Sequence, residues 1–148
     1  MKKIVIAVLA AIVVQQANAA ERTWLTDFSK AQAQAKAENK FVVMDFTGSD
    51  WCPGCIMLGK NVFDTPEFQA YAANHLVLVK VDFPHGKSQP AELKQANEAL
   101  SDRFKVDALP TVIVLDKDGK QLGQQEGYRG ESPKEFIAEL EKIEKGSR

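Results

Sequence analysis

Short apolar runs alternate with helix-forming segments along this 148-residue chain, and this alternation constrains its fold more than any other feature. A short, nearly unbroken apolar run is typical of a strand that is buried on both faces of a sheet. Such runs predict strands at residues 41–46, 76–81 and 111–115. A fourth strand is predicted at residues 120–126, after Asp116-Lys-Asp-Gly119, a hairpin turn with glycine where the backbone needs a positive φ.

Helices are predicted between these strands and after the last one. Thr26 or Asp27 caps the first helix, which runs to about Glu38 and is rich in good helix formers. Further helices are predicted at residues 52–59, from Asp64-Thr-Pro-Glu67 onward, at residues 91–104, and from Ser132-Pro133, where an apolar stripe consists of Phe136, Ile137, Leu140 and Ile143. This order of elements predicts one α/β domain with a mixed central sheet and helices on both of its faces.

The N-terminus has the three-part layout of a secretory signal. Lys2 and Lys3 precede an apolar run from Ile4 to Val14, and Ala17-Asn-Ala19 offers the small residues that a signal peptidase requires. The alternative is an uncleaved anchor, but at about 1.5 Å per residue this run is too short to span roughly 30 Å of hydrocarbon. We therefore expect residues 1–19 to be cleaved, leaving one domain at residues 20–148 that is exported to a bacterial periplasm without stable membrane insertion.

The charge pattern argues against nucleic acid as a partner. The formal net charge is −1, and removal of Lys2 and Lys3 changes it to −3, because residues 1–19 contain no acid. No basic stripe or polybasic membrane patch is visible in the sequence.

The chain has two cysteines, Cys52 and Cys55, which could form a structural disulfide, bind a metal ion or carry out thiol chemistry. A disulfide between them closes too small a loop to restrict the unfolded chain much, so a purely structural role is disfavoured. A zinc site needs two more ligands, and His75 and His85 lack the usual ligand spacing. No metal or other cofactor is predicted, and thiol chemistry remains the favoured interpretation.

The position of the pair at a predicted helix start favours that chemistry. Cys52 lies where a helix begins, so unpaired N–H groups and the helix dipole stabilise its thiolate and lower its pKa. Pro53 fits the first helical turn, where its missing N–H costs nothing. Cys55 lies one turn further on, within reach of a mixed disulfide formed at Cys52. Trp51, directly before Cys52, is expected to line a substrate surface, with packing in the core as the alternative.

These motifs resemble those of the thioredoxin superfamily. The order is a strand, then Trp-Cys-Pro-Gly-Cys, then a helix, with Leu109-Pro110-Thr111 before the hairpin. More narrowly, the chain is similar to exported bacterial thioredoxin-like proteins and Dsb-type reductases in the segments DFTGSDWCPGC, DTPEF, VDFP, PAELKQANEAL and ALPTVIVLDKDGK. The resemblance implies a thioredoxin fold and thiol-disulfide oxidoreductase activity.

The resemblance also implies roles for individual residues. Cys52 would be the exposed nucleophile and Cys55 the buried resolving thiol. Pro110 would be the cis-proline beside the cysteines, binding substrate together with Leu109, Trp51, Pro53 and Gly54.

Two further residues are predicted to assist catalysis. Asp45 resembles the buried carboxylate that assists proton transfer at the resolving thiol, and Lys80 resembles its partner. Burial should raise the pKa of Asp45, with Lys80 moderating the shift. The alternatives are a hydrogen-bonded acid at a strand end for Asp45 and a solvent-facing strand residue for Lys80.

The expected reaction is reduction of disulfides in exported proteins. Pro-Gly between the cysteines lacks the histidine that strongly oxidising and isomerising relatives usually carry there, and this dipeptide tunes the reduction potential. An oxidase or isomerase is the first alternative, and a redox-inert binding or chaperone module is the second. The expected redox partner is a membrane electron transporter, and the chain is expected to be a monomer.

Overall fold

The computed structural model describes residues 24–147, so the predicted signal peptide at residues 1–19 lies outside the described residues. The helices and strands follow one another as α1 (Phe28–Glu38), β1 (Phe41–Thr47), α2 (Pro53–Leu58), η1 (Gly59–Phe63), α3 (Pro66–His75), β2 (Leu76–Asp82), α4 (Ala91–Phe104), β3 (Thr111–Leu115), β4 (Gln121–Glu126) and α5 (Pro133–Gly146). Within residues 24–147, no helix is both long and apolar enough to cross a membrane.

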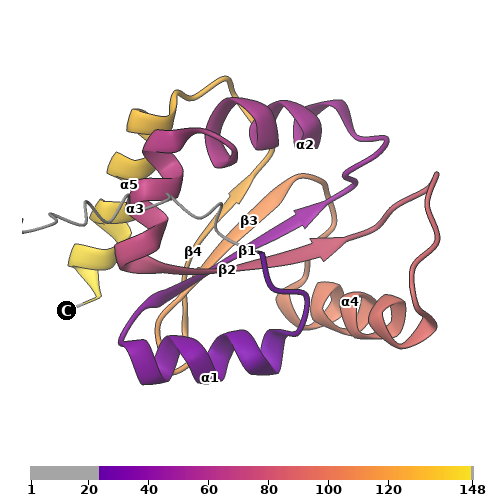
Figure 1. Cartoon of the computed structure of the whole chain (residues 1–148), viewed down its shortest axis with the longest axis horizontal. Coiled ribbons are helices and arrows are strands. Elements are labelled where there is room, and N and C mark those ends of the chain that lie inside the picture. The colour runs from indigo at the N-terminus through magenta and orange to yellow at the C-terminus, as the bar shows by residue number, and fades with distance from the viewer. Residues whose placement is uncertain (1–23, 148) are drawn as a thin grey trace, which may run out of the picture.

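The strands form one mixed sheet in the order β2-β1-β3-β4 (Figure 1). β1 pairs in parallel with β2, while β3 is antiparallel to β1 and to β4. The predicted α/β fold with a mixed central sheet is confirmed. Gly119 has the positive φ expected in the hairpin turn, at +88°. β4 begins at Gln121, one residue later than predicted, because Lys120 still belongs to the turn and donates its N–H to the Asp116 carboxylate.

α2 ends at Leu58, in agreement with the predicted end near Gly59, but a π-helix that was not predicted follows it directly. Gly59 keeps a right-handed helical conformation, with φ at −55°, and α2 continues directly into the π-helix η1. The N–H of Asp64 donates to the Gly59 carbonyl at 2.8 Å, which is the wider turn of a π-helix. The extra turn buries Val62 and Phe63 in the core, and this burial outweighs the tendency of glycine to end a helix.

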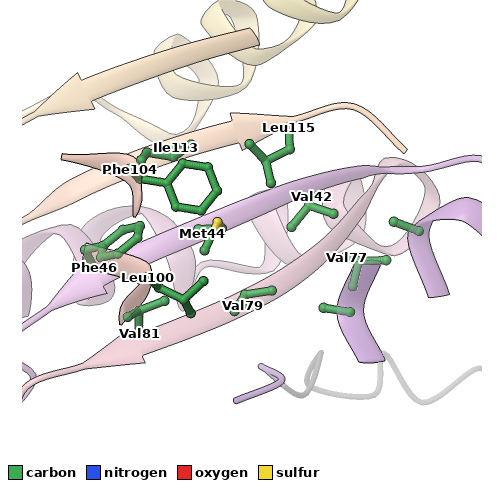
Figure 2. Packing of buried hydrophobic residues seen from close by; sticks show 12 residues of the cluster. Val42, Met44, Phe46, Val77, Val79, Val81, Leu100, Phe104, Ile113 and Leu115 are labelled. Carbon is green, nitrogen blue, oxygen red and sulfur yellow. The ribbon is translucent and has the colours of Figure 1, made fainter. Parts of the chain in front are cut away.

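Helices cover both faces of the sheet (Figure 1). On one face, α1 and α4 pack against side chains from the three strands β1, β2 and β3. Figure 2 shows Val42, Met44 and Phe46 of β1 in this cluster, between Val79 of β2 and Ile113 of β3. The other face is covered by α2, η1, α3 and α5, and its cluster includes Leu58, Phe63, Phe68 and Phe136. β1 contributes to both clusters, as its apolar sequence predicts.

Asp45 is a charged exception within β1. Alternation along the strand places its side chain on the face covered by α2, and the residue is 3 % exposed. It lies in register with Lys80 of β2, whose Nζ is 2.9 Å from Asp45 Oδ2 and 4.1 Å from the centre of the Trp24 ring. Burial raises the pKa of Asp45, and the charge and hydrogen bond of Lys80 oppose that rise. The predicted direction of the shift is confirmed.

This environment predicts that Asp45→Asn stabilises the protein at neutral pH. Because the folded protein holds the Asp45 proton to a higher pH than the unfolded chain does, wild-type stability falls as pH rises from the ordinary value of 3.8 through the raised folded pKa. Asparagine does not titrate and avoids this loss. We expect a gain in the free energy of unfolding of about 1 kcal/mol at pH 7, which disappears towards pH 3, measured by urea denaturation across that range.

Lys80→Met is the matched variant for this prediction. It removes the cation that favours ionised Asp45, so stability should fall more steeply with rising pH than in the wild type. An Asp45→Asn protein that is less stable than the wild type at pH 7 would show that the ion pair outweighs the burial of the carboxylate.

Candidate active site

The end of β1 places the two cysteines at the start of α2. Residues 48–51 connect the strand to Cys52, which caps the helix in an extended conformation, with φ at −88° and ψ at 109°. Pro53 occupies the first helical turn, where its fixed φ suits the helix. A disulfide joins Cys52 and Cys55, whose Cα atoms lie 5.2 Å apart. The local structure predicted for this pair is therefore confirmed.

Backbone N–H groups face both sulfur atoms. The N–H of Cys55 donates to Cys52 Sγ at 3.3 Å, and the N–H of Gly48 donates to Cys55 Sγ at 3.4 Å. Such donors stabilise a thiolate more than a thiol, because they interact more strongly with the charged sulfur. When the disulfide is reduced, each sulfur therefore has a backbone group placed to stabilise its charged form.

Cys52 was expected to be more exposed to solvent than Cys55, and this expectation is wrong. Both cysteines are 6 % exposed. They differ instead in their surroundings: Cys52 lines an open groove, and Cys55 is absent from its lining. Besides Cys52, the lining of this groove includes Trp51, Pro53, Gly54, Phe83 and Leu109.

Pro110 lies at the edge of this groove, against the first turn of α2. The Leu109–Pro110 peptide bond is cis, as predicted. A Cβ atom added at Gly54 would lie 3.3 Å from Pro110 Cδ, so the missing side chain of Gly54 allows this close approach. The Pro110 carbonyl accepts the N–H of Gly127 at 2.8 Å, which ties the groove edge to the end of β4. The five predicted substrate-binding residues are thus brought together around Cys52.

Asp45 and Lys80 are not part of the groove lining. Both lie on the face of the sheet that α2 covers, where the Asp45 side chain is buried and the Lys80 side chain is 28 % exposed. Asp45 Oδ2 accepts the hydrogen bond from Lys80. Its Oδ1 is buried and accepts no hydrogen bond from any residue in the described part of the chain. This oxygen can therefore take up a proton without breaking an existing bond.

A set of contacts that the sequence did not predict fixes the connection between β1 and α2. The Asp82 carboxylate accepts the N–H of Ser49 at 3.0 Å and its hydroxyl at 2.6 Å. The Asp50 carboxylate accepts the N–H groups of His85 at 2.9 Å and Gly86 at 2.6 Å, and these bonds lower the pKa of Asp50. Ser49 and Asp50, directly before Trp-Cys, are residue types that often form hydrogen bonds with nearby backbone groups. The sequence did not reveal that their partners lie in a loop about 35 positions away.

Each of the two histidines stacks on an aromatic ring, and one of these rings is that of Trp51. The indole N–H of Trp51 donates to the Phe83 carbonyl at 2.7 Å, and its ring stacks on His85 with centroids 4.2 Å apart. His75 instead stacks on Tyr71 and lies 3.7 Å from the Glu144 carboxylate. Among residues 24–147, no three His, Cys, Asp or Glu side chains are grouped so that they could hold a metal ion.

Comparisons with known proteins agree with this geometry. The profile of the thioredoxin-like domain matches residues 28–144. The chain is 37 % identical to the disulfide bond reductase DsbH of Chlamydia pneumoniae in an alignment that covers 72 % of this chain. It is 34 % identical to the thiol:disulfide interchange protein DsbD of Cronobacter sakazakii in an alignment that covers 65 % of this chain. A solved structure of a DsbH oxidoreductase superposes with a TM-score of 0.76 and 30 % identity, covering 82 % of this chain and 83 % of that one.

The matched segments span 63 % of the length of the DsbH relative and 15 % of the DsbD relative. The chain is homologous to Dsb-type disulfide oxidoreductases and carries a Cys-x-x-Cys disulfide at the start of a helix. It belongs to the thioredoxin-like domain family.

Proposed function

We propose that this protein is a periplasmic thiol-disulfide oxidoreductase that reduces disulfides in exported proteins. The observation that carries the proposal is the Cys52–Cys55 pair at a helix start, with Cys52 lining an open groove and a backbone N–H directed at each sulfur. Export is proposed from the signal-like sequence at residues 1–19.

The proposed reaction has two exchange steps. The Cys52 thiolate attacks one sulfur of a substrate disulfide, forms a mixed disulfide and releases the other substrate sulfur as a thiol. The Cys55 thiolate then attacks Cys52 Sγ, which forms the Cys52–Cys55 disulfide and releases the second substrate thiol. Two electrons pass from the protein to the substrate, and a membrane electron transporter returns them as the proposed redox partner.

The residues around Cys52 have the form of a site for an extended polypeptide. Trp51, Pro53, Gly54 and Leu109 offer mostly apolar surface along the groove, and Pro110 lies beside it. We propose that they bind the segment that flanks a substrate cysteine. The protein is proposed to act as a monomer.

Asp45 is proposed to accept the proton that Cys55 loses in the second step, with Lys80 stabilising the ionised carboxylate. The raised pKa of Asp45 supports this role, because a general base works best when its pKa lies near the working pH. Its buried Oδ1 accepts no hydrogen bond from the described residues, so this oxygen is available to take up the proton.

The reducing direction is supported by two observations. The dipeptide Pro53-Gly54 contains no histidine to stabilise the Cys52 thiolate further, and a strongly stabilised thiolate makes the disulfide more oxidising. The relative DsbH is named a disulfide bond reductase.

Separate roles for the two cysteines are tested with serine variants. Cys52→Ser should reduce insulin disulfides only at the background rate, because it lacks the attacking thiolate. Cys55→Ser should still attack once and accumulate as a mixed disulfide, visible by non-reducing mass spectrometry. In the reduced wild type, iodoacetamide should label Cys52 at least about 10-fold faster than Cys55. Equal labelling rates, or trapping by Cys52→Ser, would contradict the assignment.

The role of Asp45 is tested by single-turnover kinetics of Asp45→Asn. This change removes the proton acceptor and keeps the shape of the side chain. Resolution of the mixed disulfide near neutral pH should slow by about 10-fold or more, the usual scale of general-base effects, while the initial attack by Cys52 stays nearly unchanged. An unchanged resolution rate would leave Asp45 with a structural role alone.

A further inference from the structure

The Trp51 ring is held more closely than an exposed aromatic side chain usually is. The residue is 42 % exposed, yet its indole N–H is bonded to the Phe83 carbonyl at 2.7 Å. A Cβ atom added at Gly48 would lie 2.5 Å from the indole, so the ring rests directly on the backbone of the connection that carries it. These contacts fix one edge and one side of the ring.

His85 contacts the same connection in two ways. Its ring lies parallel to the indole of Trp51, at an interplanar angle of 2° and a centroid distance of 4.2 Å. Its backbone N–H donates to the carboxylate of Asp50, the residue before Trp51. The imidazole is therefore placed over the indole by a charge-assisted backbone hydrogen bond, and the stack does not depend on the side chain of His85 alone.

The loop that carries His85 is itself anchored to β2 and α4. Asp82, the last residue of β2, binds Ser49, and the N–H of Phe83 donates to the Thr47 carbonyl at 2.8 Å. The amide of Asn97 in α4 donates to the Asp82 carbonyl at 3.0 Å. The backbone next to His85 is thus held by hydrogen bonds, so the His85 ring can orient the neighbouring indole.

We infer that His85 is a positioning residue for substrate binding, and this inference rests on the proposed function. Its ring holds the Trp51 indole as a fixed wall of the groove that Cys52 lines. A wall that is already in place does not lose conformational freedom when a polypeptide binds, so binding is tighter. His85 does not line the groove, so its ring should affect large substrates that touch the indole and leave the reactivity of Cys52 towards small disulfides unchanged.

The test compares His85→Ala, which removes the stack, with His85→Phe, which keeps a flat ring in place of the imidazole. His85 is exposed, so neither change should unfold the protein. For insulin, His85→Ala should raise KM roughly 5-fold, the scale expected from loss of one aromatic stack, with kcat unchanged. His85→Phe should restore the wild-type KM. Reduction of bis(2-hydroxyethyl) disulfide should proceed at the same rate in all three proteins.

Ser88→Ala is the matched control from the same loop, because Ser88 is exposed and takes no part in the contacts that hold Trp51 and His85. It should leave the KM for insulin at the wild-type value. The near-ultraviolet circular dichroism of the indole gives a second readout: the Trp51 band should weaken in His85→Ala and persist in His85→Phe.

Each other result overturns the inference in a distinct way. An unchanged KM in His85→Ala would show that the stack does not support binding. Equal slowing with both disulfides would show that His85 acts on Cys52 itself, and failure of His85→Phe to restore KM would show that the imidazole is required. If the wild type reduces neither disulfide, the proposed function fails, and an unchanged circular dichroism band in His85→Ala would then overturn the positioning role separately.

Discussion

Burial of β1 on both faces is the constraint on which the rest of the structure depends. Paired with β2 on one side and β3 on the other, β1 has no free edge and contributes to the cores above and below the sheet. Its direction is therefore fixed, and so is the point at which it ends. The cysteine pair follows a short connection after that end, where α2 begins and backbone N–H groups have no helical partner. The buried strand therefore determines where α2 begins and where the two sulfur atoms lie.

Two carboxylates near the cysteines, those of Asp45 and Asp50, have pKa values that are shifted in opposite directions. Asp45 is buried, and its charge is compensated only in part by Lys80, so the pKa stays raised. Asp50 is exposed, and two backbone N–H groups lower its pKa. The first carboxylate thereby holds its proton to a higher pH, while the second accepts two N–H groups from the loop after β2. Their opposite pKa shifts follow from burial and hydrogen bonding, not from the residue type.

The sequence predicted the fold well, because its signals are local. Apolar runs, a hairpin glycine and prolines at helix starts fixed the order of elements, and Trp-Cys-Pro-Gly-Cys identified the pair of thiols. The continuation of the helix past Gly59 was not predictable from the glycine, because it depends on the burial of Val62 and Phe63 against other elements. The contacts of His85 with Asp50 and Trp51 were missed because they join segments that are distant in the sequence, and a loop histidine carries no sign of its partner.

The equilibrium reduction potential of the Cys52–Cys55 couple tests the central proposal, a dithiol that reduces substrate disulfides, most directly. The protein is equilibrated in glutathione buffers of graded ratio, and the fraction that carries the disulfide is measured by alkylation and mass spectrometry. A potential near or below about −230 mV is predicted, because the Pro53-Gly54 dipeptide between the cysteines contains no histidine to stabilise the Cys52 thiolate further. A potential approaching about −120 mV, the range of strongly oxidising enzymes, would contradict the assignment as a reductase.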